Sequence, residues 1–479
     1  MAPLTGPADP VRRGMLTRYL VAAALARVAD EGARVSLVLL ALHQTRSAAV
    51  GGAMIAALLV PHVVAGPLVG WVVDGASHPG RVLGAAIFLF AGSLLCVALL
   101  LGHTGLWLIL AILLLGGCCG PAVTGGLTSR LPSLVGEQRA PRAFGLDSLF
   151  YNVASMAGPA LAGIVAAAAG PVVAQSLLAA SAALGALGIA GLPLSALPQT
   201  SRTARPSLLS GAREVLRQPT LRVVTFTSAL GQLGPGALTV VAAALAVSVN
   251  RPAAGGLLLT AVAAGSFLGS LIWTWHPMSP QRSPLVTTVC MLGVGAPIAL
   301  AAATRSIEVT AMLFALSGFF VGPFGSALFT ARAHYTPEAV RTQVFTIGAG
   351  LKVTASALGA ALIGLVADQP IATQLLLVAI SPLLAGLIGT TLLTAGSRGV
   401  SLVTHPRVGT DDVRNKRTPQ LPRRPRSVQA VLQRDLHAGA DLQADQHEQP
   451  AVGELRAGLP QPDGEGEPQA RRERLDVGG

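Results

Sequence analysis

Twelve apolar stretches run through this chain of 479 residues, and each is long enough to cross a lipid bilayer, which takes about 20 mainly apolar residues in a helix. The chain is 52% hydrophobic and only 12% charged, whereas soluble proteins have about 25% charged residues. We therefore predict an all-α integral membrane protein with twelve transmembrane helices. The stretches fall at 17–42, 48–74, 82–102, 105–128, 144–169, 172–196, 221–249, 254–275, 285–304, 309–331, 342–367 and 370–394.

The arginines outside the apolar stretches gather on one side of the predicted membrane. Only Arg46, Arg251 and Arg305 fall in loops on the side opposite the N-terminus. Because loops rich in Arg and Lys stay in the cytoplasm, we expect both termini to be cytoplasmic and the protein to lie in the cell membrane. The same bias accounts for the net charge of +12 without any nucleic-acid partner. The arginines counted on the cytoplasmic side are Arg12, Arg13, Arg18, Arg81, Arg130, Arg139, Arg142, Arg202, Arg205, Arg213, Arg217, Arg222, Arg282, Arg332 and Arg341.

A polar interval and a polar end divide the chain into parts. The end of the chain shows no apolar period, and it carries nearly equal numbers of acidic and basic residues. Such a composition cannot bury enough apolar surface to fold, so we predict a disordered tail or the read-through of a shifted frame. The predicted parts are a cytoplasmic N-terminus (1–14), a six-helix bundle (15–196), a cytoplasmic linker with one short amphipathic helix (197–220), a second six-helix bundle (221–394) and the tail (395–479).

Three motifs occur once in each half, at nearly constant separations of 199, 202 and 201 residues. A constant separation predicts two homologous bundles in parallel order, with a substrate site between them near the middle of the membrane. The small residues in these motifs allow close helix packing. The pairs are G-x3-G-x3-D at 66–74 with G-x3-G-x3-W at 265–273, GPAVTGGLTSR at 120–130 with GPFGSALFTAR at 322–332, and GPALAGIVA from 158 with GAALIGLVA from 359.

Over residues 15–394 the chain resembles the major facilitator superfamily. The stretch GPLVGWVVDGASHPGRV is similar to that family's loop motif G-x3-D-R/K-x-G-R, although Gly75 stands where a basic residue is usual. The resemblance implies alternating access, with Asp74 pairing with a helix-four arginine and capping the start of helix eleven. These contacts would latch the halves together when the cavity opens outward. The implied latch residues are Gly70, Asp74, Arg81 and Arg130.

A second resemblance lies in the fifth apolar stretch. AGPALAG at 157–163 resembles the fifth-helix motif of antiporters, and it implies a bend and close packing at Gly158, Pro159 and Gly163. The fourth-helix arginine typical of proton-coupled drug antiporters is absent, since LLLGGCCGPAVTGG carries no charge.

Four charged residues interrupt the first apolar stretch. Arg27, Asp30, Glu31 and Arg34 are spaced three and four apart, so on a helix they are neighbours and form one self-neutralised stripe. A charge at the bilayer centre costs about 2.5–3.5 kcal/mol. We expect the stripe to face the bundle interior or a water-filled cavity. It is either a structural ion-pair network, or Asp30 or Glu31 exchanges a proton or meets a cationic substrate.

Further polar residues fall near the middle of other stretches. Lys352, one of two lysines in the chain, lies about ten residues into the eleventh stretch. It either extends along the helix to the interface or lines the cavity, where it would pair with a carboxylate or an anionic substrate. Asn152 and Gln232 are further candidates for the cavity wall, although a lone polar residue in a bundle is more often a helix–helix hydrogen bond.

Transport is the function that these features favour. We predict a secondary active transporter, most simply a monomer that exports small hydrophobic or amphipathic compounds in exchange for protons. The alternatives are proton-coupled uptake of a small solute and a membrane scaffold or receptor that transports nothing. The sequence shows no phosphate-binding loop, no metal-ligand cluster and no nucleophile–base pattern, so we expect neither enzyme activity nor a cofactor. The four cysteines lie in apolar runs, and we expect no disulfide.

Overall fold

A computed structural model describes residues 10–194, 206–251, 253–276 and 278–403 of the chain. The expectations for the rest of the N-terminus, for the start of the linker and for the tail from residue 404 onward lie outside these residues.

The first half of the chain supplies six bundle helices, two of which are interrupted. In the second, α2 and α3 meet at Val60; in the fourth, a π-helical turn, η1, separates α5 from two short helices. The elements are α1 (Pro10–Thr45), α2 (Ala48–Leu59), α3 (Pro61–Gly75), α4 (Pro79–Leu100), α5 (Leu106–Pro121), η1 (Ala122–Gly126), α6 (Leu127–Ser129), α7 (Leu131–Val135), α8 (Ala140–Ala169) and α9 (Pro171–Ala190).

The second half repeats this count after the linker helix α10 (Ser210–Arg217), which is amphipathic as predicted. Its first bundle helix is interrupted at Gly231–Gln232, between α11 and α12. The elements are α11 (Pro219–Leu230), α12 (Leu233–Ser248), α13 (Ala253–Trp275), α14 (Ser283–Ala301), α15 (Ile307–Tyr335), the short 3-10 helix η3 (Glu338–Val340), α16 (Arg341–Gly364) and α17 (Ile371–Val403).

Eleven helical segments among the described residues are long and apolar enough to span a membrane. The twelfth bundle helix is α1, which carries the four charges of the first stretch. The predicted all-α fold with twelve transmembrane helices is therefore confirmed. The last helix passes the predicted end at residue 394 and continues to Val403.

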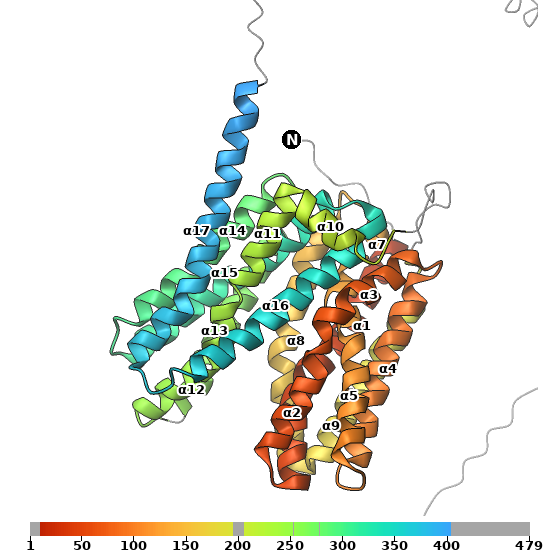
Figure 1. The fold of residues 1–479 in the computed structure, drawn as a ribbon, viewed down its shortest axis with the longest axis vertical. Coiled ribbons are helices and arrows are strands. Elements are labelled where there is room, and N and C mark those ends of the chain that lie inside the picture. The colour runs from red at the N-terminus through yellow and green to blue at the C-terminus, as the bar shows by residue number, and fades with distance from the viewer. Residues whose placement is uncertain (1–9, 195–205, 252, 277, 404–479) are drawn as a thin grey trace, which may run out of the picture. The chain divides into compact units, whose positions relative to one another are not determined.

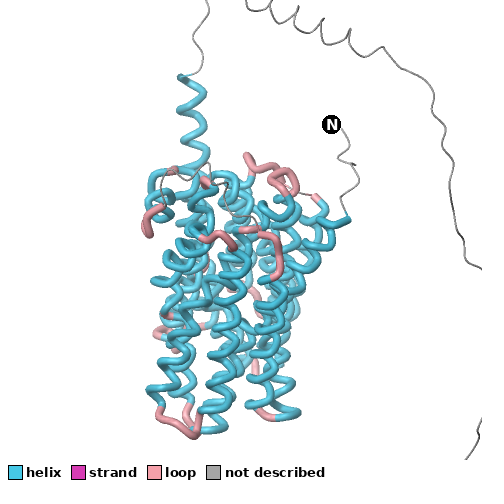
Figure 2. The backbone as a smooth tube through the Cα atoms, turned by 90° about the vertical axis from the view of Figure 1, so that its right-hand side faces the viewer, coloured by secondary structure: helices cyan, strands magenta, loops and turns pink. Residues whose placement is uncertain are grey.

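The two halves meet along two seams. At one, α16 packs against α3; at the other, α8 packs against α13 and α15. Figure 1 shows α8 and α16 where the halves meet, and Figure 2 shows most loops at the two ends of the helices. We call the end that carries α10 and the connection between α3 and α4 the linker end.

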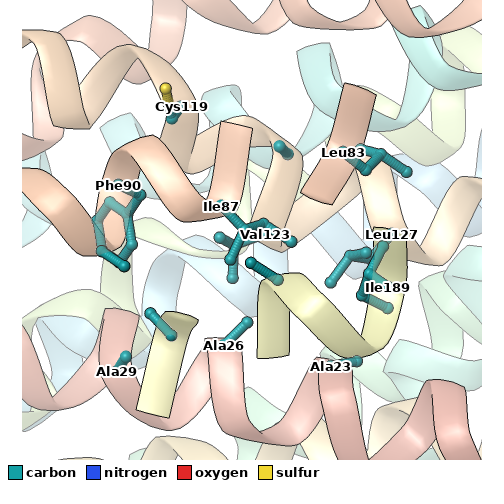
Figure 3. Packing of buried hydrophobic residues seen from close by; sticks show 14 of the residues in the cluster. Ala23, Ala26, Ala29, Leu83, Ile87, Phe90, Cys119, Val123, Leu127 and Ile189 are labelled. Atoms are coloured by element: carbon teal, nitrogen blue, oxygen red, sulfur yellow. The ribbon is translucent and has the colours of Figure 1, made fainter. Parts of the chain in front are cut away.

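Each half has an apolar core of its own. In the first half, small alanines of α1 let α9 approach closely, and α9 packs in turn against α4, whose larger side chains belong to the same core. Figure 3 shows Ala23, Ala26 and Ala29 of α1 along one side of this core, with Ile87 and other large side chains facing them. Burial of this kind positions the polar side chains of α1, because the helix cannot rotate without exposing its alanine face to larger neighbours.

Candidate functional site

Arg27 on α1 forms a buried ion pair with Asp147 on α8. Its Nη1 lies 2.8 Å from Asp147 Oδ1, and its Nη2 lies 3.1 Å from Oδ2. Tyr19 and Thr128 donate further hydrogen bonds to the same carboxylate, at 3.0 and 2.7 Å. Arg27 and Asp147 are 1% and 0% exposed, so the network is sealed from water.

This pairing corrects the prediction of one four-charge stripe. Arg27 binds across to α8 rather than to Asp30 or Glu31 on its own helix. The physical reason is geometric: a carboxylate on a facing helix can accept two parallel hydrogen bonds from a guanidinium, which gives the strongest form of this ion pair.

The other three charges of α1 pair with one another, as predicted. Arg34 Nη2 lies 3.3 Å from Asp30 Oδ2, and Arg34 Nη1 lies 2.9 Å from Glu31 Oε2. Asp30 is buried, whereas the side chains of Glu31 and Arg34 are 13% and 31% exposed. Glu31 and Arg34 are therefore the members of this group that solvent or a ligand can reach.

A cavity of about 440 Å³ lies between the two halves, and Glu31 and Arg34 form part of its wall. The predicted candidates Asn152, Gln232 and Lys352 also line it. Arg27 and Asp30 do not. The rest of the wall is mainly apolar: Leu59, Pro235, Leu238, Val262, Met291, Val294, Val321, Phe324, Phe329, Phe345, Ala349, Val353, Ala357 and Ala360.

Two of the helix interruptions adjoin this cavity. Thr124 and Gly125 of the π-helical turn line it, as does Gln232 at the break between α11 and α12. Proline near each break removes a backbone donor and prevents a regular helix, at Pro121 and Pro235. π-Helical turns occur often at functional sites because they place side chains out of the helical register.

The polar candidates differ in their partners. Asn152 donates a hydrogen bond of 2.8 Å to Ser270 on α13, so it also joins the halves. The ammonium of Lys352 lies 5.3 Å from the centre of the Phe324 ring, over its face. Within the described ranges, no carboxylate lies within 4.0 Å of this ammonium. Lys352 therefore enters the cavity as a cation without an ion-pair partner there.

Arg332 is a cavity residue that sequence reasoning placed in a loop. It lies within α15, which continues to Tyr335, and it is 1% exposed and lines the cavity. Its repeat partner Arg130 likewise sits at the end of α6 and is buried. The matching motifs GPAVTGGLTSR and GPFGSALFTAR were the signal that could have placed both arginines inside the bundle.

Asp147 and Tyr151 are the other residues that sequence reasoning missed. Asp147 is an acidic residue inside the fifth apolar stretch, 144–169, and that charge is the sequence signal that could have identified it. Tyr151, one turn later on α8, lines the cavity, and its ring lies 5.0 Å from the guanidinium of Arg27.

At the linker end, Asp74 makes the contacts that the family resemblance implied. Its Oδ1 accepts a hydrogen bond of 2.7 Å from Arg130 Nη2. The backbone N–H groups of Thr342 and Gln343, in the first turn of α16, donate to its carboxylate at 3.1 Å each. A carboxylate is favourable at a helix N-terminus, where N–H groups lack partners within the helix.

Other members of the predicted latch differ in their surroundings. A β-carbon at Gly70 would overlap the backbone of Gln343, so the glycine allows α3 and α16 to touch. Arg81 is exposed near the start of α4, and it takes no part in the hydrogen bonds of Asp74. Arg341 instead reaches across the halves to Glu137, at 2.9 Å.

Three aromatic rings lie between these contacts and the cavity. Phe144, Phe329 and Phe345 have ring centres 6.1–6.2 Å apart, and they come from α8, α15 and α16. Phe345 follows the Asp74-bound turn of α16 by less than one helical turn, and both Phe329 and Phe345 line the cavity. The cavity is therefore closed toward the linker end by aromatic side chains and then by hydrogen bonds.

The helix-five motif packs closely at one glycine only. A β-carbon at Gly158 would lie 2.6 Å from the carbonyl oxygen of Val28, so α1 and α8 are in contact there. Pro159 lies inside α8. A β-carbon at Gly163 would meet no atom within 4 Å, so this glycine contributes no close packing.

No set of three His, Cys, Asp or Glu side chains is placed to hold a metal ion within the described residues. The four cysteines are unbonded thiols. The charged and polar side chains in the cavity wall are groups that a ligand can contact, among them Glu31, Arg34, Arg332 and Lys352.

Comparison with known proteins gives a consistent picture. The model of the Major Facilitator Superfamily matches residues 19–360. An uncharacterised transporter of this type from Sinorhizobium fredii is 28% identical over 384 residues, which are 78% of this chain and 93% of that protein. The enterobactin exporter EntS of Salmonella typhimurium is 31% identical over 278 residues, 56% of this chain, and the match spans 65% of the exporter's length.

Solved structures resemble the described fold at low sequence identity. A bacterial homologue of the iron transporter ferroportin, in an outward-facing state, gives a TM-score of 0.63 at 16% identity, and the match covers 80% of this chain and 99% of that one. The E. coli fucose:proton symporter FucP also gives 0.63, at 12% identity, over 79% and 98% of the two chains.

Proposed function

Because this chain belongs to the major facilitator superfamily, we propose that it exports small hydrophobic or amphipathic compounds in exchange for protons. Members of the family are transporters rather than enzymes. The chain is a multi-pass membrane protein, with helices long and apolar enough to span the membrane. What the proposal adds is the direction of transport, the driving ion and the class of cargo.

The observation that carries the proposal is the cavity between the halves. Its wall is mostly aliphatic and aromatic, which suits a cargo with an apolar body. A sugar site would need more hydrogen-bonding groups. The volume of about 440 Å³ falls in the range of small-molecule sites, roughly 300–1,000 Å³.

Closure of one end of this cavity supports alternating access. We take the linker end as cytoplasmic, because the arginine count favours that side. The ring cluster of Phe144, Phe329 and Phe345, with the contacts of Asp74 beyond it, would then hold the protein closed to the cytoplasm. In the other state these contacts must break, so that cargo enters from the cytoplasm.

Similarity to exporters supports the direction. Proteins named as enterobactin exporters are about 30% identical to this chain over more than half of its length. The helix-five motif, with Gly158 packed against α1, points the same way. Likeness to the fucose symporter concerns the fold alone, because the identity is 12%.

Glu31 is the carboxylate that we propose to exchange the proton. It lines the cavity and its side chain is partly exposed, whereas Asp147 and Asp30 are buried and do not line the cavity. When the Glu31 carboxylate is ionised, Arg34 is its ion-pair partner in the low-dielectric interior.

Measuring dye content and drug tolerance in cells tests this proposal directly. The wild-type chain, Glu31→Gln and Asp30→Asn would be expressed in a bacterial host lacking its own major efflux pumps, with a panel of toxic compounds and fluorescent dyes. Glu308→Gln serves as the matched control, because it makes the same carboxylate-to-amide change at a side chain that is two-thirds exposed and does not line the cavity. We expect wild type and the control to lower dye content and raise tolerance, and Glu31→Gln to lose both.

Two results would contradict the proposal. An importer would raise the content of a compound, and its Glu31→Gln variant would lose that accumulation. A scaffold would change neither quantity, whichever variant was expressed.

A further inference from the structure

Arg332 is a buried cation without a counterion. Its side chain is 1% exposed, its Nη2 donates a hydrogen bond of 3.1 Å to Ser228, and its Nε makes none. In the part of the chain that the structure describes, no carboxylate lies within ion-pair distance of it. A buried charge left in this way is costly unless something else compensates it.

The internal repeat shows what Arg332 lacks. Arg130 holds the equivalent position in the first half, and there Asp74 neutralises it at 2.7 Å. The residue that corresponds to Asp74 in the second half is Trp273. The second half therefore has the arginine of this pair without its carboxylate.

Lys352 lies next to this arginine. The guanidinium of Arg332 sits directly against Gly348 of α16, where a β-carbon would overlap it. Lys352 follows Gly348 by four residues, which places both on the same face of the helix. The two cations repel each other, and both line the same cavity.

Counting the charges around the cavity leaves one positive charge uncompensated. Arg27 and Asp147 cancel. Asp30, Glu31 and Arg34 together carry one negative charge, while Arg332 and Lys352 carry two positive charges. A ligand with a single negative charge would make the total neutral.

We propose that Arg332 and Lys352 form an anion subsite, and that the cargo is an amphipathic compound with one anionic group such as a carboxylate. A guanidinium offers a planar set of donors that matches a carboxylate. The aromatic and aliphatic wall around Phe324, Met291 and Val294 receives the apolar body. This inference rests on the proposed function, since it names the cargo of the same cavity. An inside-negative membrane potential favours outward movement of such an anion.

Binding of matched ligands tests the subsite without any need for transport. Full-length protein in phosphatidylcholine nanodiscs would be dialysed against radiolabelled 1-naphthoate, 1-naphthylmethanol or 1-naphthylmethylamine, with protein-free nanodiscs as the blank. The three share a body and differ in charge. We expect wild type to bind the anion most tightly.

Variants then assign the preference to the two cations. Arg332→Gln and Lys352→Gln should each weaken naphthoate binding by about tenfold or more, as expected for a lost hydrogen bond to a charged group, and leave the alcohol unchanged. Arg332→Lys and Lys352→Arg should retain most of the anion preference. Arg251→Gln, which removes an exposed arginine, should behave as wild type.

Clear results would overturn the inference. These are equal binding of naphthoate and the alcohol by wild type, or an equal loss of both ligands in the Gln variants, which is the sign of a structural role. If Arg332→Gln does not fold, the wild-type ranking and Lys352→Gln decide alone. Anion preference without any export would contradict the proposed function only, and export of uncharged compounds without anion preference would contradict this inference only.

Discussion

The guanidinium of Arg27 on α1 and the carboxylate of Asp147 on α8 form two parallel hydrogen bonds, 2.8 and 3.1 Å long, in a part of the first bundle that water does not reach. These hydrogen bonds connect α8, which packs against the second half, to α1, the helix that carries Glu31. The pair lies beside the cavity but not in its wall, so we assign it to structure and not to transport.

Removing one member of this pair should destabilise the protein strongly. Asp147→Ala leaves a buried arginine uncompensated, an effect of about 3–5 kcal/mol. Arg27→Met combined with Asp147→Leu removes both charges and should recover most of the loss. Unfolding the purified proteins in detergent by heat or denaturant measures these differences in stability. Equal stability of Asp147→Ala and wild type, or a double variant less stable than Asp147→Ala, would contradict the assignment.

Packing between α1 and α8 predicts a contrast between two glycines. Gly158→Ala would place a methyl group against the backbone of Val28, and overpacking of this kind costs roughly 1–3 kcal/mol. Gly163→Ala meets open space and should be tolerated. The yield of monodisperse protein and its melting temperature compare the two. A Gly163→Ala variant as unstable as Gly158→Ala would show that the motif acts in some other way.

Asp74 should control access from the linker end. Its loss removes the two hydrogen bonds that its carboxylate accepts from α16 across the halves, each worth about 1.5–3 kcal/mol, so the closed state should lose population by at least tenfold. A cysteine probe at Ser129, which is buried and bonded to Thr342, reports opening when it reacts with a thiol reagent. The native cysteines would be replaced first.

We expect Asp74→Ala to raise the labelling rate of the Ser129→Cys probe and Arg81→Gln to leave it unchanged, because Arg81 is exposed and outside the contacts of Asp74. If Arg81→Gln opened the probe as much as Asp74→Ala, the hydrogen bonds of Asp74 would not be what keeps this end closed.

Sequence reasoning succeeded where the membrane itself sets the pattern. Hydropathy located all twelve helices, because a run of about 20 apolar residues matches the thickness of the hydrocarbon core of a bilayer. It did less well at helix ends, since apolar character marks the hydrocarbon and not the end of the backbone hydrogen bonds. For this reason α17 was predicted to end nine residues early, and Arg332 was taken for a loop residue.

The site was predictable in part for a similar reason. Spacing along one helix brought Arg34 together with Asp30 and Glu31. Spacing could not reveal that Arg27 pairs with Asp147, which lies 120 residues away on another helix. That contact depends on how α8 is packed against α1, which no local period encodes.

Glu31 and its neighbour Asp30 should respond differently to loss of charge. Asp30→Asn removes a buried partner of Arg34 and should lower stability. Transport by the folded fraction of this variant should still depend on protons. Glu31→Gln should leave the melting temperature close to that of wild type, because its side chain is reachable by solvent, and should abolish coupling. Melting temperature and transport, measured on the same preparations, separate the two effects.

Proton-coupled flux in proteoliposomes tests the central claim most directly. Purified protein would be reconstituted with an exported compound from the dye panel, a pH gradient would be imposed, and the movements of compound and protons would be recorded together. The account predicts that wild type moves the compound against its gradient while protons move the other way, that a protonophore stops both, and that Glu31→Gln uncouples them. Transport by wild type that ignores the pH gradient, or a Glu31→Gln variant that stays fully coupled, would contradict it.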